Sequence, residues 1–475
     1  MRWSSFLATL ALLASIFSIA GLSASNAQTI GWAKYLDGIN QNDIGYRVAI
    51  YSDYIIVVGS YNNGTHLKIF VANLSKADGT IKWVQGLKIH DNDEAYDVAV
   101  DSEGNIYVVG QAQDIGVGYY EFVAKFKPDK TLVWSKIWDA INIKNVGVAV
   151  DSGENVYVAG AIPEGSYTDC LIMKLKSDDG SVIWSKKIGI SNNYEYAIDT
   201  AVDSNNNIYV MGYNGTAGVF LLKLSDDGTM IWGKTWQIIS TTNGRALTVD
   251  TSGNIYVAGD FLSPASYRDV FIAKFDQSGN PIWAKGWNFR SDFAFSMAAD
   301  SQQVYLAGYV FDPSTNDHAA LIIALDPDGV LKWDILFNGT GFDEANGLAS
   351  GSLYITGGTT SPSLALEDIS GNIRDVTIFP FMTIFGGPTD ITLTLTDLGV
   401  EYTNVLPGET TDRYWWDIFI LRLDGPAPPV GGEIMSPQLS EAWRSSTPLI
   451  AATSAVLLIT AGIIIISSAK RNRRD

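Results

Sequence analysis

Residues 98–110 read Val-Ala-Val-Asp-Ser-Glu-Gly-Asn-Ile-Tyr-Val-Val-Gly, and closely similar blocks occupy residues 148–160, 200–212 and 247–259. Each block joins a short apolar run ending in Asp, a turn of small polar residues, and a second apolar run ending in Gly. Apolar runs bounded by turn residues are typical of strands, so each block predicts a β-hairpin. Its recurrence about every 50 residues predicts a repeat architecture.

Tryptophans complete the repeat unit. Seven of them are spaced 48 to 51 residues apart: Trp32, Trp83, Trp134, Trp184, Trp232, Trp283 and Trp333. Between each hairpin and the next tryptophan lies a third apolar run, such as Phe271–Phe275, and a turn such as Asp178-Asp-Gly180. Four short antiparallel strands in a unit of this length form a propeller blade. We expect the tryptophans to pack between blades.

The two ends of the repeat region predict how the ring closes. Residues 31–34 match the tryptophan strand of a blade but precede the first complete unit. The last unit has a third strand at 417–423 and no tryptophan strand of its own. The expected fold is therefore all-β: a seven-bladed β-propeller over residues 28–424, in which the N-terminal strand completes the seventh blade.

This pattern resembles the SBBP-type β-propeller repeats of secreted and surface proteins of bacteria and archaea. The likeness rests on the hairpin blocks quoted above and extends over about residues 31–423, with degenerate turns in blades one, six and seven. The resemblance implies the fold and a surface protein, and it implies little about activity, because propellers host many unrelated functions.

The sequences of both termini predict that the domain between them lies outside the cell. Residues 1–27 have the basic start, apolar run and small-residue end of a secretory signal peptide. Residues 447–469 are long and apolar enough for a transmembrane helix. The basic tail, 470–475, would stay in the cytoplasm. The Pro/Gly-rich residues 425–446 predict an extended stalk. The expected location is the cell membrane, single-pass, with the N-terminal ectodomain outside.

The composition of the chain excludes several kinds of partner and site. The 475 residues include 51 Asp and Glu against 32 Lys and Arg, a net charge of −19, which argues against a nucleic-acid partner. A lone cysteine, Cys170, rules out an internal disulfide and a multi-cysteine zinc site. We expect this residue to act as a small apolar filler, and no motif predicts a cofactor.

Carboxylates occupy five of the seven equivalent positions before the inner strands. They are Asp43, Asp93, Glu195, Asp292 and Asp343. Because inner strands line the axial channel, these side chains are candidates for a ring that holds a cation such as Ca²⁺, which prefers several oxygen ligands. The alternative is that each carboxylate accepts backbone N–H bonds between blades.

One connection departs from the repeat. Residues 358–416, between the second and third strands of blade seven, are rich in aromatic residues and contain no lysine. Long loops on a rigid scaffold often carry binding sites. The candidate anchors for a ligand or partner are Phe379, Phe381, Tyr414, Trp415 and Trp416. Two interpretations remain open: a lid or extra sheet that contacts a ligand, or a hairpin packed on the rim.

Three functions agree with these features. The preferred one is an extracellular binding or adhesion module for a glycan or an envelope protein. Candidate glycosylation sites are Asn63, Asn73, Asn214 and Asn338, and the low charge and sequons suit an archaeal exterior. The second function is a structural component of the cell envelope, associated with a surface layer.

The third function is a quinone-dependent dehydrogenase. Residues 223–232 and 324–333 are similar to the tryptophan-docking motif of those enzymes. Their Asp-Gly turn is one residue short and vicinal cysteines are absent from the chain, so we expect no enzyme.

Overall fold

The structure is a computed structural model. It describes residues 29–36, 43–142, 146–189, 194–215, 218–238, 242–263, 267–288, 290–338, 342–350 and 353–359. Further along the chain it describes strands at 363–368, 372–375, 379–382, 389–390, 396–397, 401–403, 417–424 and 433–435. Within these residues the regular secondary structure is β.

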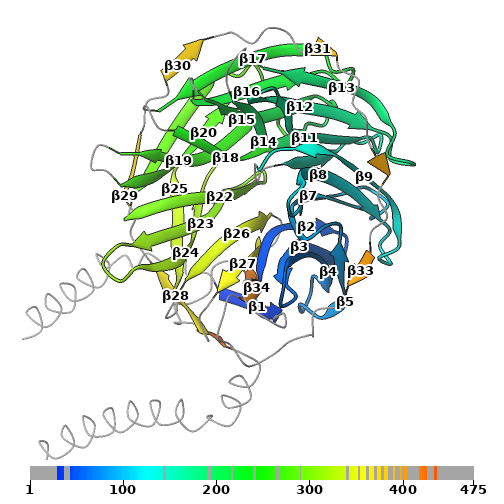
Figure 1. Cartoon of the computed structure of the whole chain (residues 1–475). Helices are drawn as coiled ribbons and strands as arrows, with labels where there is room; N and C mark the ends of the chain where they lie inside the picture. Colours follow the sequence, from blue (N-terminus) through cyan, green and yellow to red (C-terminus); the bar gives the residue numbers. More distant parts are fainter. Residues whose placement is uncertain are drawn as a thin grey trace, which may run out of the picture.

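Seven antiparallel sheets are arranged around a central axis (Figure 1), which confirms the predicted seven-bladed propeller. The inner strands are β2 (Ile44–Tyr51), β6 (Asn92–Val100), β10 (Gly147–Val150), β14 (Glu195–Val202), β18 (Thr242–Val249), β22 (Ser291–Ala299) and β26 (Asp343–Ala349). The second strands are β3 (Tyr54–Asn62), β7 (Ile106–Asp114), β11 (Val156–Glu164), β15 (Ile208–Asn214), β19 (Ile255–Leu262), β23 (Val304–Asp312) and β27 (Leu353–Thr359).

The outer half of each blade follows the same order. The third strands are β4 (Leu67–Ser75), β8 (Gly118–Phe126), β12 (Tyr167–Leu175), β16 (Gly218–Leu224), β20 (Arg268–Phe275), β24 (Asp317–Leu325) and β34 (Asp417–Asp424). The fourth strands are β5 (Ile81–Lys88), β9 (Leu132–Ala140), β13 (Val182–Ile188), β17 (Met230–Gln237), β21 (Pro281–Asn288), β25 (Leu331–Asn338) and β1 (Thr29–Leu36).

The N-terminal strand closes the ring, as predicted. The sheet of blade seven has the order β1-β34-β27-β26, and Ala33 pairs with Leu421. Two segments almost 400 residues apart in sequence thus share one blade. The second and third strands of the blades are buried on both faces, which is why they are continuous apolar runs rather than alternating ones.

The turn of each hairpin block is built around its aspartate. Asp101 accepts backbone N–H bonds from Glu103 (3.0 Å) and Asn105 (2.8 Å), and its second oxygen accepts the Tyr107 hydroxyl at 3.0 Å. Asp151, Asp203 and Asp250 repeat this network. Aspartate side chains commonly bond to the backbone in such turns, so this set is structural.

The tryptophans hold neighbouring blades together. Trp134 in blade two donates its indole N–H to the Ser177 carbonyl in blade three at 2.8 Å. The same turn carries Gly180 at φ +68°, where a Cβ would lie 2.7 Å from the Trp134 ring. Equivalent bonds join five more blade pairs, from Trp32, Trp83, Trp184, Trp232 and Trp283. The predicted interblade role is confirmed.

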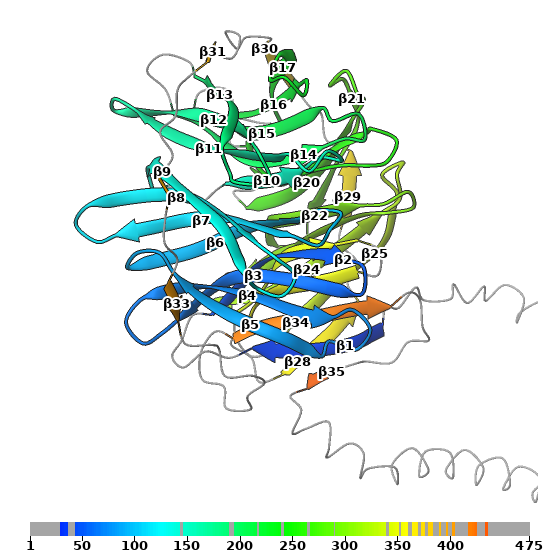
Figure 2. The same ribbon diagram turned by 90° about the vertical axis from the view of Figure 1, so that its right-hand side faces the viewer.

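The blade-seven insert follows the outside of the ring (Figures 1 and 2). Its six strands are β28 (Ser363–Asp368), β29 (Asn372–Asp375), β30 (Phe379–Met382), β31 (Thr389–Asp390), β32 (Thr396–Asp397) and β33 (Glu401–Thr403). In that order they pair with the fourth strands of blades six, five, four, three, two and one. We call these six strands the belt. The belt is neither a lid over one face nor a single hairpin.

Several predicted segments lie outside the described residues. They are residues 1–27, 447–469 and 470–475, and residues 425–446 apart from β35 (Glu433–Met435), which pairs with β28. In the described part of the chain, no helix has the length and apolar character needed to span a bilayer.

Candidate ligand-binding site at the axial channel

The inner strands share a β-bulge at one level. In six blades the pairing with the second strand skips one residue: Tyr46, Tyr96, Ile198, Arg245, Phe295 and Asn346. A bulge leaves its extra residue out of the ladder and turns the side chain in a new direction. Here the six side chains are directed toward the axis of the propeller.

In the six blades that have the bulge, the glycine near the middle of the second strand makes room for it. A Cβ on Gly110 would lie 2.0 Å from the Glu94 carbonyl oxygen, and one on Gly308 would lie 1.8 Å from that of Phe293. Gly59, Gly212, Gly259 and Gly357 have the same close approach to the inner strand. These glycines are therefore required by backbone contact within the blade.

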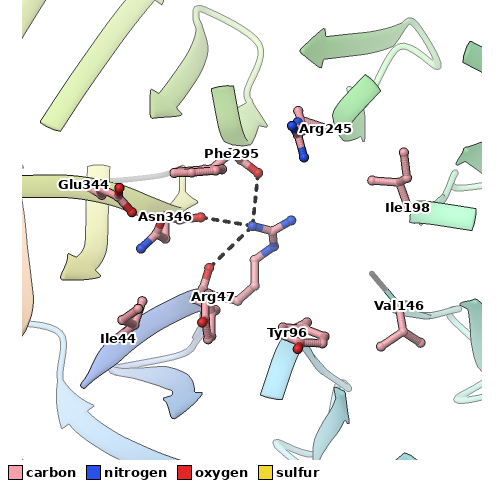
Figure 3. Close-up of a pocket in the computed structure, with 10 residues that line it drawn as sticks. Ile44, Arg47, Tyr96, Val146, Ile198, Arg245, Phe295, Glu344 and Asn346 are labelled. Atoms are coloured by element: carbon pink, nitrogen blue, oxygen red, sulfur yellow. Dashed lines mark hydrogen bonds between the residues drawn. The ribbon is translucent and has the colours of Figure 1, made fainter. Parts of the chain in front are cut away.

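The bulge residues line a cavity on the axis of about 240 Å³ (Figure 3). Val146 of blade three lines it as well, so every blade contributes, and Ile44, Arg47 and Glu344 complete the lining. Sites for drug-sized ligands are usually somewhat larger. The cavity therefore suits a small group or one end of a longer ligand.

Arg47 ties four blades together in this cavity. One guanidinium nitrogen, Nη1, donates to the carbonyls of Tyr46 (3.4 Å), Phe295 (3.2 Å) and Asn346 (3.0 Å). Its Nε lies 3.6 Å from the Asp97 carboxylate. All three carbonyls belong to bulge residues, which no longer use them in the ladder. Figure 3 shows the guanidinium between these carbonyls.

In blades two and four the residue after the bulge is an aspartate that fastens the inner strand to the next blade. Asp97 accepts the N–H of Val148, and Asp199 accepts that of Leu247, each at 2.8 Å. Burial raises the pKa of both carboxyls, that of Asp199 to about 7, with the charge of Asp97 adding to the shift and Arg47 opposing it. These acids are part of the inner ring rather than of a ligand surface.

A polar groove adjoins the cavity on blades one to three. It also measures about 240 Å³ and shares Tyr96 with the axial cavity. Its other lining residues are Leu67, Asn92, Glu94, Gln111, Gln113, Tyr119 and Asn142. Apart from Asn142, these residues lie in β4, β6, β7 and β8, near the strand ends that join the second-to-third connections and the connections between blades. The groove thus lies toward the face that carries the connections between second and third strands, where the blade-seven insert also begins.

The groove side chains are positioned by one another. Asn92 donates to the Gln113 side-chain oxygen at 3.1 Å, and Gln113 donates to the Tyr119 hydroxyl at 3.0 Å. Gln111 donates to the Ile141 carbonyl at 2.7 Å. An amide can both donate and accept hydrogen bonds, and these bonds fix the orientation of the side chains in the groove.

The carboxylates of the predicted cation ring do not line the axial channel. Asp43, Asp93, Glu195, Asp292 and Asp343 are fully buried, and none of them lines the cavity or the groove. Asp43 accepts the N–H of Asn62 at 2.8 Å, and Asp93 accepts those of Ile89 and His90 at 2.9 Å. Among the described residues, no three His, Cys, Asp or Glu side chains are grouped to hold a metal ion. The cation ring stays a prediction that these contacts do not support.

The predicted anchors do not meet at this site. Phe379 and Phe381 lie in β30 at the outer edge of blade four, away from the axis (Figure 1). Tyr414, Trp415 and Trp416 lie outside the described residues. The channel residues were missed at the sequence level, although the glycine ending each second strand was a signal for them, because glycine inside a strand often marks a bulge.

The candidate glycosylation sites differ in exposure. Asn63 is exposed in the connection after β3, whereas Asn73 and Asn214 are buried in strands. Of these three, only Asn63 presents its side chain at the surface of the folded domain. Asn338 ends β25, and its side chain is outside the described set. Cys170 is buried, as expected.

Residues 86–114 match the family model of the SBBP β-propeller repeat. The chain carries an SBBP-type β-propeller. An uncharacterized WD repeat-containing protein of Acanthamoeba polyphaga mimivirus is 24% identical over 222 residues, 41% of this chain. The chain spans 14% of the length of that relative.

Solved structures similar to this SBBP-type propeller include three proteins. Quinohemoprotein alcohol dehydrogenase from Comamonas testosteroni has a TM-score of 0.42 at 9% identity, covering 71% of this chain and 74% of its own. Sqt1 from Chaetomium thermophilum has a TM-score of 0.43 at 10% identity, covering 72% and 85%. Polysaccharide lyase Uly1 has a TM-score of 0.43 at 8% identity, covering 76% and 98%.

Proposed function

We propose that this propeller is a binding module for an extracellular glycan, and that the ligand lies in the groove on blades one to three with one end in the axial cavity. The observation that supports the proposal is the composition of the groove. Asn92, Gln111 and Gln113 supply neutral amides next to the rings of Tyr96 and Tyr119.

Sugar hydroxyls both donate and accept hydrogen bonds, and an amide side chain offers both functions at a fixed spacing. Tyrosine rings provide flat apolar area with a polar tip. Glu94, which accepts the Tyr46 hydroxyl at 3.2 Å, adds a charged acceptor at the junction of groove and cavity. The expected export of the ectodomain would bring this face into contact with glycans of the cell's own envelope or of other cells.

The test is binding of the full-length protein in detergent to a glycan array, followed by calorimetry with the best oligosaccharide. Gln113→Ala and Tyr119→Ala should each weaken binding about tenfold, because each removes a contact of about 1–2 kcal/mol. The matched control is Gln302→Ala, an exposed amide on the opposite face. Unchanged affinity in both groove variants would refute the site, and binding of no glycan would refute the function.

A further inference from the structure

Arginines are concentrated at the channel in a chain that is otherwise acidic. The net charge is −19. Five arginine side chains lie in the part of the chain whose side chains are described: Arg47, Arg245, Arg268, Arg290 and Arg422. Two of these, Arg47 and Arg245, line the axial cavity, and Arg268 shares a carboxylate with Arg245. Arg245 and Arg268 belong to blade five, across the mouth of the axial cavity from the amide groove on blades one to three.

A single buried carboxylate orients two of these guanidinium groups. Asp260 is fully buried, lies 3.0 Å from Arg245 Nε, and also forms an ion pair with Arg268. The Asn243 side chain donates to the same carboxylate at 3.0 Å. One negative charge thus faces two positive charges. Arg245 is bound through Nε, so the outer edge of its guanidinium is directed toward the cavity (Figure 3).

Aromatic rings extend this half of the mouth. The Arg268 guanidinium lies over the Phe293 ring at 5.8 Å, and Phe293 stacks on Tyr309 at 4.6 Å. Tyr309 stacks in turn on His318 at 4.3 Å. The negative group on this side that lines the cavity, Glu344, is bonded to His318 at 2.8 Å. The three rings therefore form a face-to-face stack that begins at the Arg268 guanidinium and ends at His318.

We propose that the glycan is acidic, and that Arg245 and Arg268 bind the carboxylate of a uronic-acid residue while the amide groove binds the neutral part. This inference rests on the proposed glycan function and names the ligand class. Guanidinium groups bind carboxylates through two parallel N–H bonds, a geometry that lysine does not offer. The two halves of the mouth then recognise two parts of one chain.

The test compares ligands that differ only in charge. Trimers of galacturonate, glucuronate and mannuronate are titrated into the full-length protein in detergent, each beside its fully methyl-esterified form. We expect at least one acid trimer to bind ten or more times tighter than its ester, and we expect this ratio to shrink as salt rises from 0.05 to 0.5 M. The wild-type comparison needs no variant and is therefore independent of folding effects.

Variants then test which arginines cause the preference for the acid over the ester. Arg245→Gln and Arg268→Gln should each bring the acid-to-ester ratio to within threefold. Arg290→Gln is the matched control, since Arg290 is 46% exposed, pairs with Asp312 and does not line the cavity. Equal binding of acid and ester overturns this inference and leaves the glycan function standing. Binding of neither overturns both, and an unchanged ratio in both arginine variants overturns the assigned site.

Discussion

Gly308 shows how one missing side chain shapes the channel. Its ladder partner on the inner strand is Ala294, and the bulge that follows directs Phe295 into the cavity. A Cβ at Gly308 would sit 1.8 Å from the Phe293 carbonyl oxygen, which is backbone and cannot rotate away. The glycine is therefore a requirement of the bulge and hence of the cavity lining.

Gly308→Ala should lower the free energy of unfolding by about 2–4 kcal/mol, because the backbone of the inner strand must move. Chemical denaturation measures this loss. The control is Gly153→Ala, where the nearest atoms to an added Cβ are side-chain atoms at 3.3 Å. Equal stability of the two variants would show that the inner strand adjusts freely.

Glu121 is a second residue with a measurable signature. It is fully buried between blades two and three, accepts the Trp138 indole N–H at 3.1 Å, and has its pKa raised by burial to about 8. The folded protein therefore holds a proton that the unfolded chain releases near pH 4.5. Protonated Glu121 therefore makes its whole contribution to the free energy of unfolding below that pH, and this contribution is lost as the pH rises toward 8.

Glu121→Gln mimics the protonated acid and should remove this dependence. Between pH 5 and 8 the wild type should lose on the order of 1–3 kcal/mol more stability than the variant. Denaturation curves at several pH values measure the difference. Parallel pH profiles for the two proteins would contradict the burial of this acid.

At the scale of the element, β1 is the strand on which ring closure depends. It covers the outer edge of β34, and Trp32 donates to the Lys76 carbonyl of blade one at 3.2 Å. The Trp32 ring also lies under Gly79, where a Cβ would come within 2.5 Å of it. One strand thus completes blade seven and joins it to blade one.

Trp32→Ala should cost about 3 kcal/mol, within the usual range for a large aromatic residue, while Trp32→Phe should cost less because a ring remains. Deletion of residues 29–36 should lower the melting temperature of the whole ring in a single transition, since an open ring exposes both blade seven and blade one. An unchanged melting temperature after the deletion would contradict closure by this strand.

At the scale of the whole molecule, the belt covers sheet edges that would otherwise be exposed to solvent. Without it, the fourth strands of six blades would present unpaired N–H and C=O groups, which invite pairing with other chains. The belt strands cover part of these edges with as few as two paired residues each. The belt strands pair in turn with blades six, five, four, three, two and one, and the next strand of the chain, β34, belongs to blade seven.

Replacement of residues 360–414 with a short Gly-Ser turn should leave the four-stranded blades intact but lower the melting temperature. The exposed edges should also cause self-association that increases with concentration, measurable by light scattering. The control shortens the blade-six connection at residues 313–316, which carries no edge strand. A variant that stays monomeric with unchanged melting would show that the belt does not protect these edges.

The number of blades, the strand order and the closing strand were determined by the sequence alone. They depend on local signals that recur around the ring: apolar runs, an aspartate turn such as the one at Asp101, and a tryptophan that docks on the next blade. Each signal acts within a few residues, and the repetition makes the period unambiguous even where blades one, six and seven depart from the motif.

The lining of the channel and the course of the belt were decided by tertiary structure. A bulge inserts one residue and reverses which face the next side chain occupies, so Arg245 lines the cavity whereas the acids predicted for the channel are buried. The belt strands are two to six residues long, too short for a hydrophobic period to specify them. Each belt strand exists because a fourth strand with open hydrogen-bonding groups lies beside it, and only the assembled ring places that strand there.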